Sequence, residues 1–230
     1  MNESVYTRSE QLLGEDILNK IKGMCVAVVG VGGVGGFATE ALVRLGVGKL
    51  VIIDKDVVSI TNINRQIIAS KETLGKPKVS IMKDRIRAIN QEIEVVSYLD
   101  NFDASKASLI LENGVDYVVD AIDSLSCKWD LIKLCLDNKI PFISSLGMGN
   151  RIDPSQIKIT TLDKTSNDPL AKKLRLMARK ENYDLGKINC VFSSEIPRVN
   201  LRPPSSIVLT PSVSGIYCAS AFLNFVLYGK

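Results

Sequence analysis

The stretch that decides the fold comprises residues 24–66 and reads MCVAVVGVGGVGGFATEALVRLGVGKLVIIDKDVVSITNINRQ. It opens with an apolar run at residues 24–29, which is bounded by glycine and predicts a buried strand. Glycines in G-x-G-x-x-G spacing follow, and residues 37–45 have a helical pattern. A second apolar run, residues 50–53, ends on Asp54. This order of strand, glycine turn, helix, strand and acid is typical of a nucleotide-binding fold.

The glycine turn predicts a contact with phosphate. Glycines allow a tight turn and let the backbone approach a ligand, and the N-terminus of the next helix offers unpaired N–H groups and the positive end of its dipole. Asp54 is placed to accept hydrogen bonds from ribose hydroxyls. The predicted phosphate-binding glycines are Gly30, Gly32, Gly33 and Gly35. Because an NAD-dependent dehydrogenase would show the same pattern, these features predict a nucleotide without saying which one.

The sequence after Asp54 favours a triphosphate. A polar and cationic cluster follows, which comprises Asn62, Asn64, Arg65, Gln66 and Lys78. Positive charge is needed where bonds to phosphorus are made and broken. Arg65 can make a bidentate contact, and Lys78 can act as a point charge. A dehydrogenase has no particular need for such a cluster.

These residues resemble a known superfamily. GVGGVGG at residues 30–36, IDKD at 53–56, TNINRQ at 61–66 and the lysine that follows resemble the ubiquitin-activating-enzyme-like superfamily of ATP-dependent adenylating enzymes, which includes ThiF, MoeB and HesA. More narrowly, the chain is similar to the family of tRNA threonylcarbamoyladenosine dehydratases over roughly residues 8–223. The motifs that carry this narrower resemblance are DAIDS (120–124), SSLGMGN (144–150), KTSNDPLAKKLR (164–175), VFSSE (191–195), PPSS (203–206) and PSVSG (211–215).

The resemblance implies ATP and Mg²⁺ as cofactors and assigns roles to residues. Asp123 would lie near Mg²⁺ and the phosphates, although Asp120 or Asp123 could instead cap the next helix. Arg8 would reach the ATP of the other subunit of a homodimer, although a solvated surface arginine is the alternative. Arg8, Arg65, Lys78 and Asp123 are therefore the candidate catalytic residues. The nucleotide contacts implied are the four glycines, Asp54, Asp56, Asn62, Asn64, Arg65, Gln66, Lys78, Ala121, Ile122 and Asp123.

The resemblance implies a reaction on tRNA that carries threonylcarbamoyladenosine. ATP would activate the carboxylate of this group, next to the anticodon, and ring closure would follow with net loss of water. A sulfur-carrier-protein adenylyltransferase like ThiF or MoeB is the main alternative, and a dehydrogenase and a non-catalytic nucleotide-binding scaffold also remain open. Those adenylyltransferases usually hold a structural zinc through two Cys-x-x-Cys pairs. The five cysteines here, at positions 25, 127, 135, 190 and 218, form no such pair, so no structural zinc is expected.

Length and composition set further limits. A chain of 230 residues predicts a single domain spanning residues 1–230. The net charge of +4 permits a nucleic-acid partner without demanding one. The absence of histidine excludes an imidazole base or ligand. The polar N-terminal sequence and the unpaired cysteines predict a cytoplasmic protein.

The remaining patterns predict an α/β fold: a Rossmann-like, mostly parallel sheet with helices on both faces, extended by further C-terminal strands and a helix. The expected helices are residues 6–21, 74–90, 104–112, 126–138 and 213–228, and the expected strands are 92–98, 116–122, 140–145 and 156–162. Cys127 and Cys135 are expected to be packing residues, and Cys190 a buried strand cysteine. The uncharged run at 203–229 is broken by proline, serine and glycine, so a buried return strand and a core helix are expected rather than a membrane span. The basic helix expected in 169–180 suits either RNA phosphates or a solvated face.

Overall fold

One seven-stranded sheet organises the molecule, in the order β3-β2-β1-β4-β5-β7-β6. The computed structural model describes residues 4–201 and 203–229. Every neighbouring pair is parallel except β6 and β7, which are antiparallel. The predicted α/β fold with a mostly parallel sheet is confirmed. The strands are β1 (Cys25–Val29), β2 (Lys49–Ile53), β3 (Glu94–Tyr98), β4 (Tyr117–Asp120), β5 (Phe142–Ser145), β6 (Ile157–Thr161) and β7 (Asn189–Ser193).

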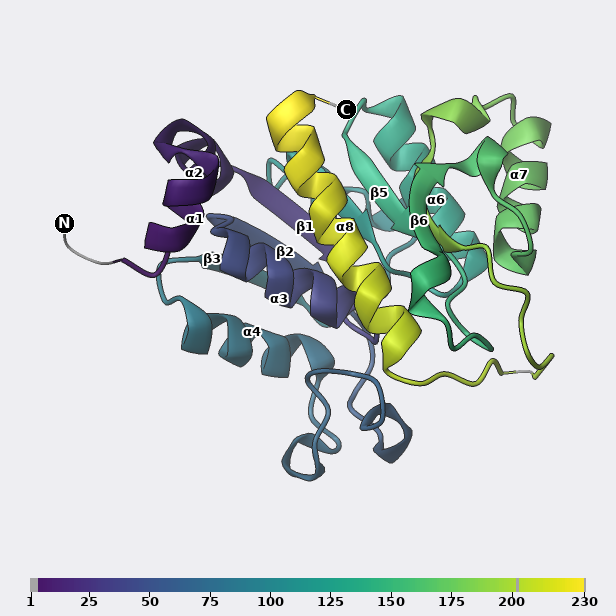
Figure 1. The fold of residues 1–230 in the computed structure, drawn as a ribbon, viewed down its shortest axis with the longest axis horizontal. Helices are drawn as coiled ribbons and strands as arrows, with labels where there is room; N and C mark the ends of the chain where they lie inside the picture. Colours follow the sequence, from purple (N-terminus) through teal and green to yellow (C-terminus); the bar gives the residue numbers. More distant parts are fainter. Residues whose placement is uncertain (1–3, 202, 230) are drawn as a thin grey trace.

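Helices cover both faces of this sheet (Figure 1). On one face, Leu42, Met82 and Phe222 from three helices share a core with the strands. On the other face, Ile110, Trp129 and Leu174 do the same. The helices of the first face are α2 (Glu15–Lys22), α3 (Gly35–Leu45), α4 (Lys78–Ile89) and α8 (Leu209–Tyr228); those of the second are α5 (Ser108–Leu111), α6 (Leu125–Asp137) and α7 (Pro169–Lys180); α1 (Thr7–Leu13) packs against α2.

The strand order places a switch point between β1 and β4. From β1 the chain passes through α3 to β2 on one side, and it returns to β4 on the other side. The backbones stay paired beyond the strand ends, because the Gly30 N–H donates to the Ile53 carbonyl at 2.8 Å and the Ala121 N–H donates to the Val29 carbonyl at 2.9 Å. Ligands of open α/β sheets bind at such a point, outside the carboxyl ends of the strands.

The C-terminal helix α8 differs from the prediction in its extent. It begins at Leu209 rather than at residue 213, and described residues 203–208 form no strand, so the expected return strand is wrong. Proline and serine leave this segment irregular, and β7 supplies the last strand of the sheet instead. Gly215 lets α8 lie close to α3, since a Cβ there would overlap the Val34 carbonyl oxygen. Within the described residues, α8 is long and apolar enough to cross a membrane, but half of that window is buried against the sheet.

Two other helices expected from the sequence are interrupted. Residues 6–21 form α1 and α2, which are separated at Gly14, where φ is +85°. Residues 104–112 form a 3₁₀ turn, η3 (Ala104–Lys106), and the single turn of α5. The remaining expected helices and strands are present, with ends shifted by a few residues.

A buried ion pair ties β4, β5 and α6 together beneath the switch point. Lys128 and Asp120 are both fully buried, with the Lys128 Nζ 2.7 Å from the Asp120 Oδ2. Lys128 also donates to the Ser145 carbonyl at 2.9 Å, and Ser144 Oγ donates to the same Asp120 oxygen at 2.6 Å. The Asp120 Oδ1 accepts the Ile122 N–H at 3.0 Å. Asp120 is therefore a structural residue that shapes the turn leading to Asp123.

We predict that removing one partner of this pair is far worse than removing both. Asp120→Asn should destabilise the fold by about 3 kcal/mol or more, because it leaves an uncompensated charge on Lys128. Adding Lys128→Met should recover much of that loss. Urea unfolding of the two single variants and the double variant measures this coupling. Simple addition of the two single effects would contradict it.

Candidate active site

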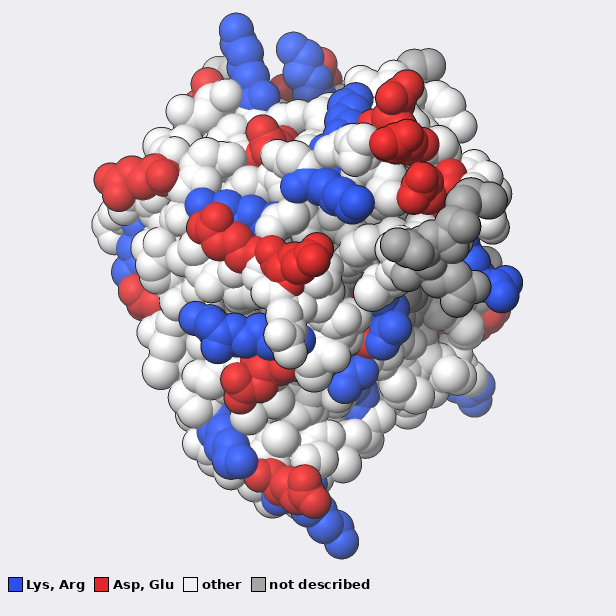
Figure 2. Space-filling model, turned by 90° about the vertical axis from the view of Figure 1, so that its left-hand side faces the viewer, with Lys and Arg blue, Asp and Glu red and all other residues white. Residues whose placement is uncertain are grey.

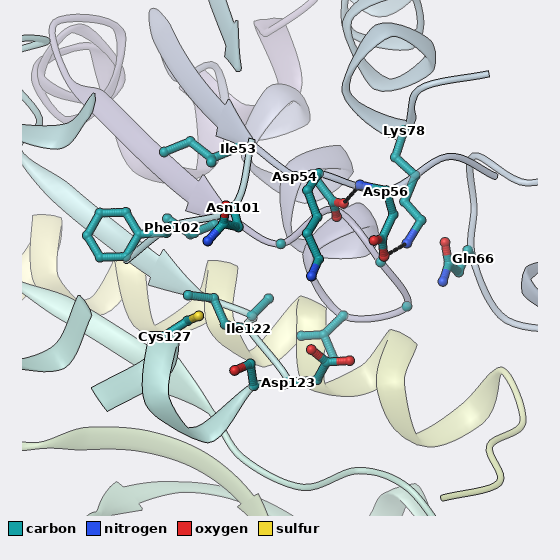
Figure 3. Close-up of a pocket in the computed structure, with 18 of the residues that line it drawn as sticks. Ile53, Asp54, Asp56, Gln66, Lys78, Asn101, Phe102, Ile122, Asp123 and Cys127 are labelled. Atoms are coloured by element: carbon teal, nitrogen blue, oxygen red, sulfur yellow. Dashed lines mark hydrogen bonds and ion pairs between the residues drawn. The ribbon is translucent and has the colours of Figure 1, made fainter. Parts of the chain in front are cut away.

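A cavity of about 310 Å³ lies outside the carboxyl ends of β1, β2 and β4. Figure 3 shows the side chains that surround it. Its size suits a small ligand, and its place is the one expected for a nucleotide in this fold. The predicted site residues that line it are Gly30, Gly32, Gly33, Asp54, Asp56, Arg65, Gln66, Lys78, Ala121, Ile122 and Asp123.

The glycines between β1 and α3 divide into two roles. Gly30 has a φ of +89°, and a Cβ there would lie 2.6 Å from the Ala121 carbonyl oxygen. A Cβ on Gly35 would overlap the Gly30 carbonyl oxygen, and Gly35 does not line the cavity. Gly32 has open space beside it, the nearest atom to a Cβ being Gln66 Nε2 at 3.6 Å. Gly30 and Gly35 therefore shape the turn, whereas Gly32 and Gly33 leave the cavity open.

Asp54 is fixed to this turn by its own carboxylate. Its Oδ2 accepts the Val31 N–H at 2.6 Å, and its Oδ1 accepts the Asp56 N–H at 2.8 Å. Burial raises the pKa of Asp54, while the nearby positive charge of Lys78 acts in the opposite direction. The carboxyl group thus holds the loop in place and still faces the cavity, where ribose hydroxyls are expected.

Three cationic side chains line the cavity: Lys55 and Arg65 from the segment between β2 and α4, and Lys78 at the start of α4. Lys78 is buried, and its Nζ pairs with Asp56 Oδ2 at 2.8 Å. Arg65 is half-buried and donates from Nη1 to the Thr61 carbonyl at 2.7 Å, which orients the guanidinium. Gln66 is only 7% exposed, and its Oε1 has no hydrogen-bond partner among the described residues. That oxygen is buried below the cavity surface, so it offers no direct contact to a ligand in this conformation.

The opposite end of the cavity is mainly apolar, with Asn101 beside Phe102 as a polar neighbour. In Figure 3, Phe102, Ile122 and Cys127 gather on one side, away from Lys78 and Gln66. Asp123 lies between the two ends, on the turn after β4. An apolar end that leads to a cationic end matches a nucleotide, because the base is flat and largely apolar and the phosphates are negative.

The residues between β3 and η3 were missed by sequence reasoning. Asp100, Asn101 and Phe102 line the cavity directly after β3 ends at Tyr98. Parallel strands have their carboxyl ends at the same edge of a sheet, and this rule placed the residues after β4 at the site. The same rule applied to β3 would have predicted these three residues as well. Cys127 was expected to be a packing residue, but it is half-buried in the cavity wall. Cys190 is buried in β7 as predicted, and burial raises the pKa of its thiol.

Two predicted contacts support the cationic segment and lie outside the lining. Asn62 caps the turn η1 (Ile60–Asn62), where its Oδ1 accepts the Ser59 N–H at 3.0 Å. Asn64 Nδ2 donates to the Ser206 carbonyl at 2.8 Å and its Oδ1 accepts from Arg65 at 3.0 Å. Both residues therefore position Arg65, and direct contact of either with a nucleotide stays a prediction.

Arg8 lies away from the cavity of its own chain. It is exposed on α1, whose neighbour Tyr6 donates to the Val43 carbonyl at 3.1 Å, at the end of α3 remote from the glycine turn. Lys20 of α2 donates to the Val226 carbonyl at 2.8 Å, close to the C-terminal end of α8. Arg8 therefore sits at the amino edge of the sheet, and a role at an ATP site requires a second chain.

Comparison with known proteins identifies the family. The sequence model of the ThiF family matches residues 6–227 of this chain. The chain belongs to the ThiF family. It is 42% identical over 92% of its length to the tRNA threonylcarbamoyladenosine dehydratase of Bacillus subtilis, covering 90% of that protein. It is also 42% identical to the enzyme of the same name from Escherichia coli, over 80% of this chain and 71% of that one.

Solved structures of other proteins agree with the fold. The crystal structure of the E. coli tRNA N6-threonylcarbamoyladenosine dehydratase in complex with ATP superposes with a TM-score of 0.91 at 36% identity, covering 97% of this chain and 94% of that one. The E. coli protein MccB in complex with ATP, at 21% identity and a TM-score of 0.68 over 98% of this chain and 64% of that one, shares the fold.

Without a bound nucleotide, the cavity has few side chains that could coordinate a metal ion. Within residues 4–201 and 203–229, no group of three or more Cys, Asp or Glu side chains could hold a metal ion. Asp56 is engaged with Lys78, which leaves Asp123 as the exposed carboxylate on the turn after β4. One carboxylate together with phosphate oxygens fits the way Mg²⁺ is bound in nucleotide enzymes.

We predict that two glycine substitutions in this ThiF-family loop separate binding from folding. Gly32→Ala should leave the stability nearly unchanged and weaken ATP binding about tenfold or more, because the new methyl group narrows the backbone approach to phosphate. Gly35→Ala should instead destabilise the fold by overlap with Gly30. Titration calorimetry with ATP and thermal unfolding measure the two effects. Equal effects of both substitutions on stability would be inconsistent with these roles.

Proposed function

We propose that this ThiF-family protein is an ATP-dependent enzyme that dehydrates threonylcarbamoyladenosine next to the anticodon of tRNA to its cyclic form. The observation that carries the proposal is the cavity, which Arg65 lines and in which Lys78 lies away from the apolar end, with Asp123 on the turn between the two ends. Identity of 42% to a tRNA threonylcarbamoyladenosine dehydratase over nearly the whole chain supports the choice of substrate. A tRNA substrate also favours a cytoplasmic location.

The proposed chemistry consists of two substitutions. An oxygen of the substrate carboxylate attacks the α-phosphorus of ATP, and pyrophosphate leaves. The carbamoyl moiety of the same side chain then attacks the activated carbonyl and loses a proton, and AMP leaves with the original carboxylate oxygen. The carboxylate is already a nucleophile at neutral pH, so the reaction needs positioning and charge stabilisation rather than an imidazole base.

The cavity residues supply that stabilisation. The N–H groups around Gly32 and Gly33 and the start of α3 face the phosphates, and Lys78 and Arg65 stabilise the negative charge that moves onto pyrophosphate. Asp54 holds the ribose. Asp123 would hold Mg²⁺ together with the phosphates, and the ion would neutralise charge on the leaving group.

Lys78→Ala is predicted to lower kcat/KM by about 100-fold or more, because one preorganised cation is lost from the site of charge development. The fold should survive, since the partner carboxylate on Asp56 has a side chain that is 52% exposed and becomes solvated. The assay is mass spectrometry of tRNA nucleosides after incubation with ATP and modified tRNA, with thermal unfolding as the control. Turnover of a carrier protein ending in Gly-Gly, with none on tRNA, would instead support a sulfur-carrier adenylyltransferase.

We also propose a homodimer in which α8 pairs with its copy around a twofold axis. Leu209, Ile216 and Tyr228 on α8 are 48%, 49% and 69% exposed, and residues 203–229 carry no charge. The cavity lies beside the start of α8 at Pro211, whereas α1 and α2 lie near its end (Figure 1). An antiparallel pairing of the two α8 helices would exchange these ends and bring Arg8 of one protomer toward the cavity of its partner.

A mixing experiment tests this arrangement. Arg8→Ala and Lys78→Ala should each be inactive alone, but a heterodimer keeps one site with both residues intact. Mixed and re-equilibrated variants should therefore recover about a quarter of wild-type activity for a symmetric dimer with random exchange. Activity that stays at the level of the single variants, with subunit exchange shown by native mass spectrometry, would exclude action of Arg8 between subunits.

A further inference from the structure

The helix α7, Pro169–Lys180, has one apolar face and one strongly cationic face. It reads PLAKKLRLMARK and contains no acidic residue. Ala171, Leu174 and Ala178 are fully buried and fix its inner face against the core shared with α6. The outward residues include four exposed cations, Lys172, Lys173, Arg179 and Lys180, which we call the α7 stripe. The side chains of the stripe are exposed and do not pack against the rest of the protein.

The stripe has no ion-pair partner among the described residues, although the pKa of the neighbouring Glu181 is lowered by a hydrogen bond from Trp129 and, to a lesser extent, by the charge of Lys180. Within residues 4–201 and 203–229, other Lys and Arg side chains form ion pairs with carboxylates, but none of these pairs includes a side chain of the stripe. The fifth cation of α7, Arg175, is different, because it donates to the Thr165 carbonyl at 3.1 Å and is half-buried. The stripe therefore presents four positive charges without an ion-pair partner among the described residues, along a helix of 12 residues, or about 18 Å.

The helix α4 provides the contrast. Of its four cations, Lys78 and Arg85 are paired with Asp56 and Glu40. Asp84 stands beside Lys83 and interrupts the series. Figure 2 shows the face at the left of Figure 1, where the N-terminal helices lie, and there basic and acidic side chains are interspersed. A mixed face of that kind is what solvation alone requires. A helix bearing one sign of charge favours a polyanionic partner.

The start of α7 is anchored at the edge of the sheet where the cavity opens. Asp168 caps the helix by accepting the Leu170 N–H at 2.8 Å, and its other oxygen accepts the Gly147 N–H at 3.0 Å. Gly147 belongs to the loop that follows β5, and β5 lies beside β4, which carries the turn to Asp123. Arg151 fastens the same loop, with Nη2 donating to the Asn167 carbonyl at 2.8 Å. The stripe is thus held rigidly with respect to the catalytic edge.

We propose that the α7 stripe binds the phosphate backbone of the tRNA while the modified adenosine occupies the cavity. This inference rests on the proposed function, since it names the surface that meets the substrate. Lys and Arg contacts to phosphate position a nucleic acid without reading its sequence, and they release counterions, so the affinity falls as the salt concentration rises. The ATP site is separate from the stripe and is not involved in these contacts.

Kinetics on the full-length protein test the proposal. The variant Lys172→Gln/Lys173→Gln/Arg179→Gln/Lys180→Gln should raise the KM for modified tRNA by about 10-fold to 100-fold at physiological salt, with the KM for ATP unchanged. The slope of log kcat/KM for tRNA against log salt should become less steep by about 3, which is roughly 0.7 to 0.9 for each lost contact. Lys172→Arg/Lys173→Arg keeps the charge and should behave as wild type.

The matched control is Lys83→Gln/Arg87→Gln on α4, to be compared with Lys172→Gln/Lys173→Gln. The control should leave the KM and salt slope for tRNA unchanged, while the α7 double variant should shift both. An unchanged tRNA KM and salt slope in the α7 variants, or an equal shift in the α4 control, would overturn the proposal. ATP binding and thermal unfolding confirm that each variant is folded.

Direct binding keeps this test separate from the proposed reaction. Fluorescence anisotropy with tRNA and no ATP should show weaker binding for the four-residue variant than for wild type. If the wild-type protein fails to dehydrate modified tRNA, the proposed function is lost whatever the anisotropy shows. If it succeeds and the variant binds tRNA equally well, only the role of the α7 stripe is lost.

Discussion

The structure depends on one close approach between backbones, where the turn after β1 meets the turn after β4. Gly30 lies against the Ala121 carbonyl, so a side chain there would push the two turns apart. Gly35 lies against the Gly30 carbonyl, so a side chain there would distort the loop that makes this contact. This contact brings the start of α3 and the residues 121–123 to the same cavity. The glycine loop and the carboxylate of Asp123 can act on one ligand only because the sheet reverses its strand order at this point.

The charged side chains near the site include a buried ion pair that fixes the backbone and cations that line the cavity. The fully buried charge of Lys128 is matched by Asp120 beneath the turn, which fixes the backbone that leads to Asp123. Above it, Lys78 is held by Asp56, whose other face is solvated. A protein without histidine can still catalyse acyl activation in this way, because the reacting groups need fixed positive charge and orientation more than proton transfer.

Most of the fold and the core of the site could be predicted from the sequence, because both depend on local patterns. The apolar runs marked β1 and β2, and the glycine spacing with Asp54 marked the loop that lines the cavity. The failures came where tertiary contacts decide. Residues 203–208 stay irregular because two prolines and two serines open the segment, and β7 takes the place beside β5 in the sheet. Phe102 enters the site only because β3 ends beside β2. A local sequence pattern likewise cannot tell whether Arg8 of one protomer approaches the cavity of its partner.

In the proposed reaction an oxygen of the substrate carboxylate forms a bond to the α-phosphorus of ATP in this cavity. Mass spectrometry of the nucleotide products can follow this oxygen when the threonylcarbamoyl carboxylate of modified tRNA is labelled with ¹⁸O. We expect AMP that carries one labelled oxygen, formed together with unlabelled pyrophosphate in equal amount to the cyclised nucleoside. Unlabelled AMP, or the label in inorganic phosphate released with ADP, would contradict it.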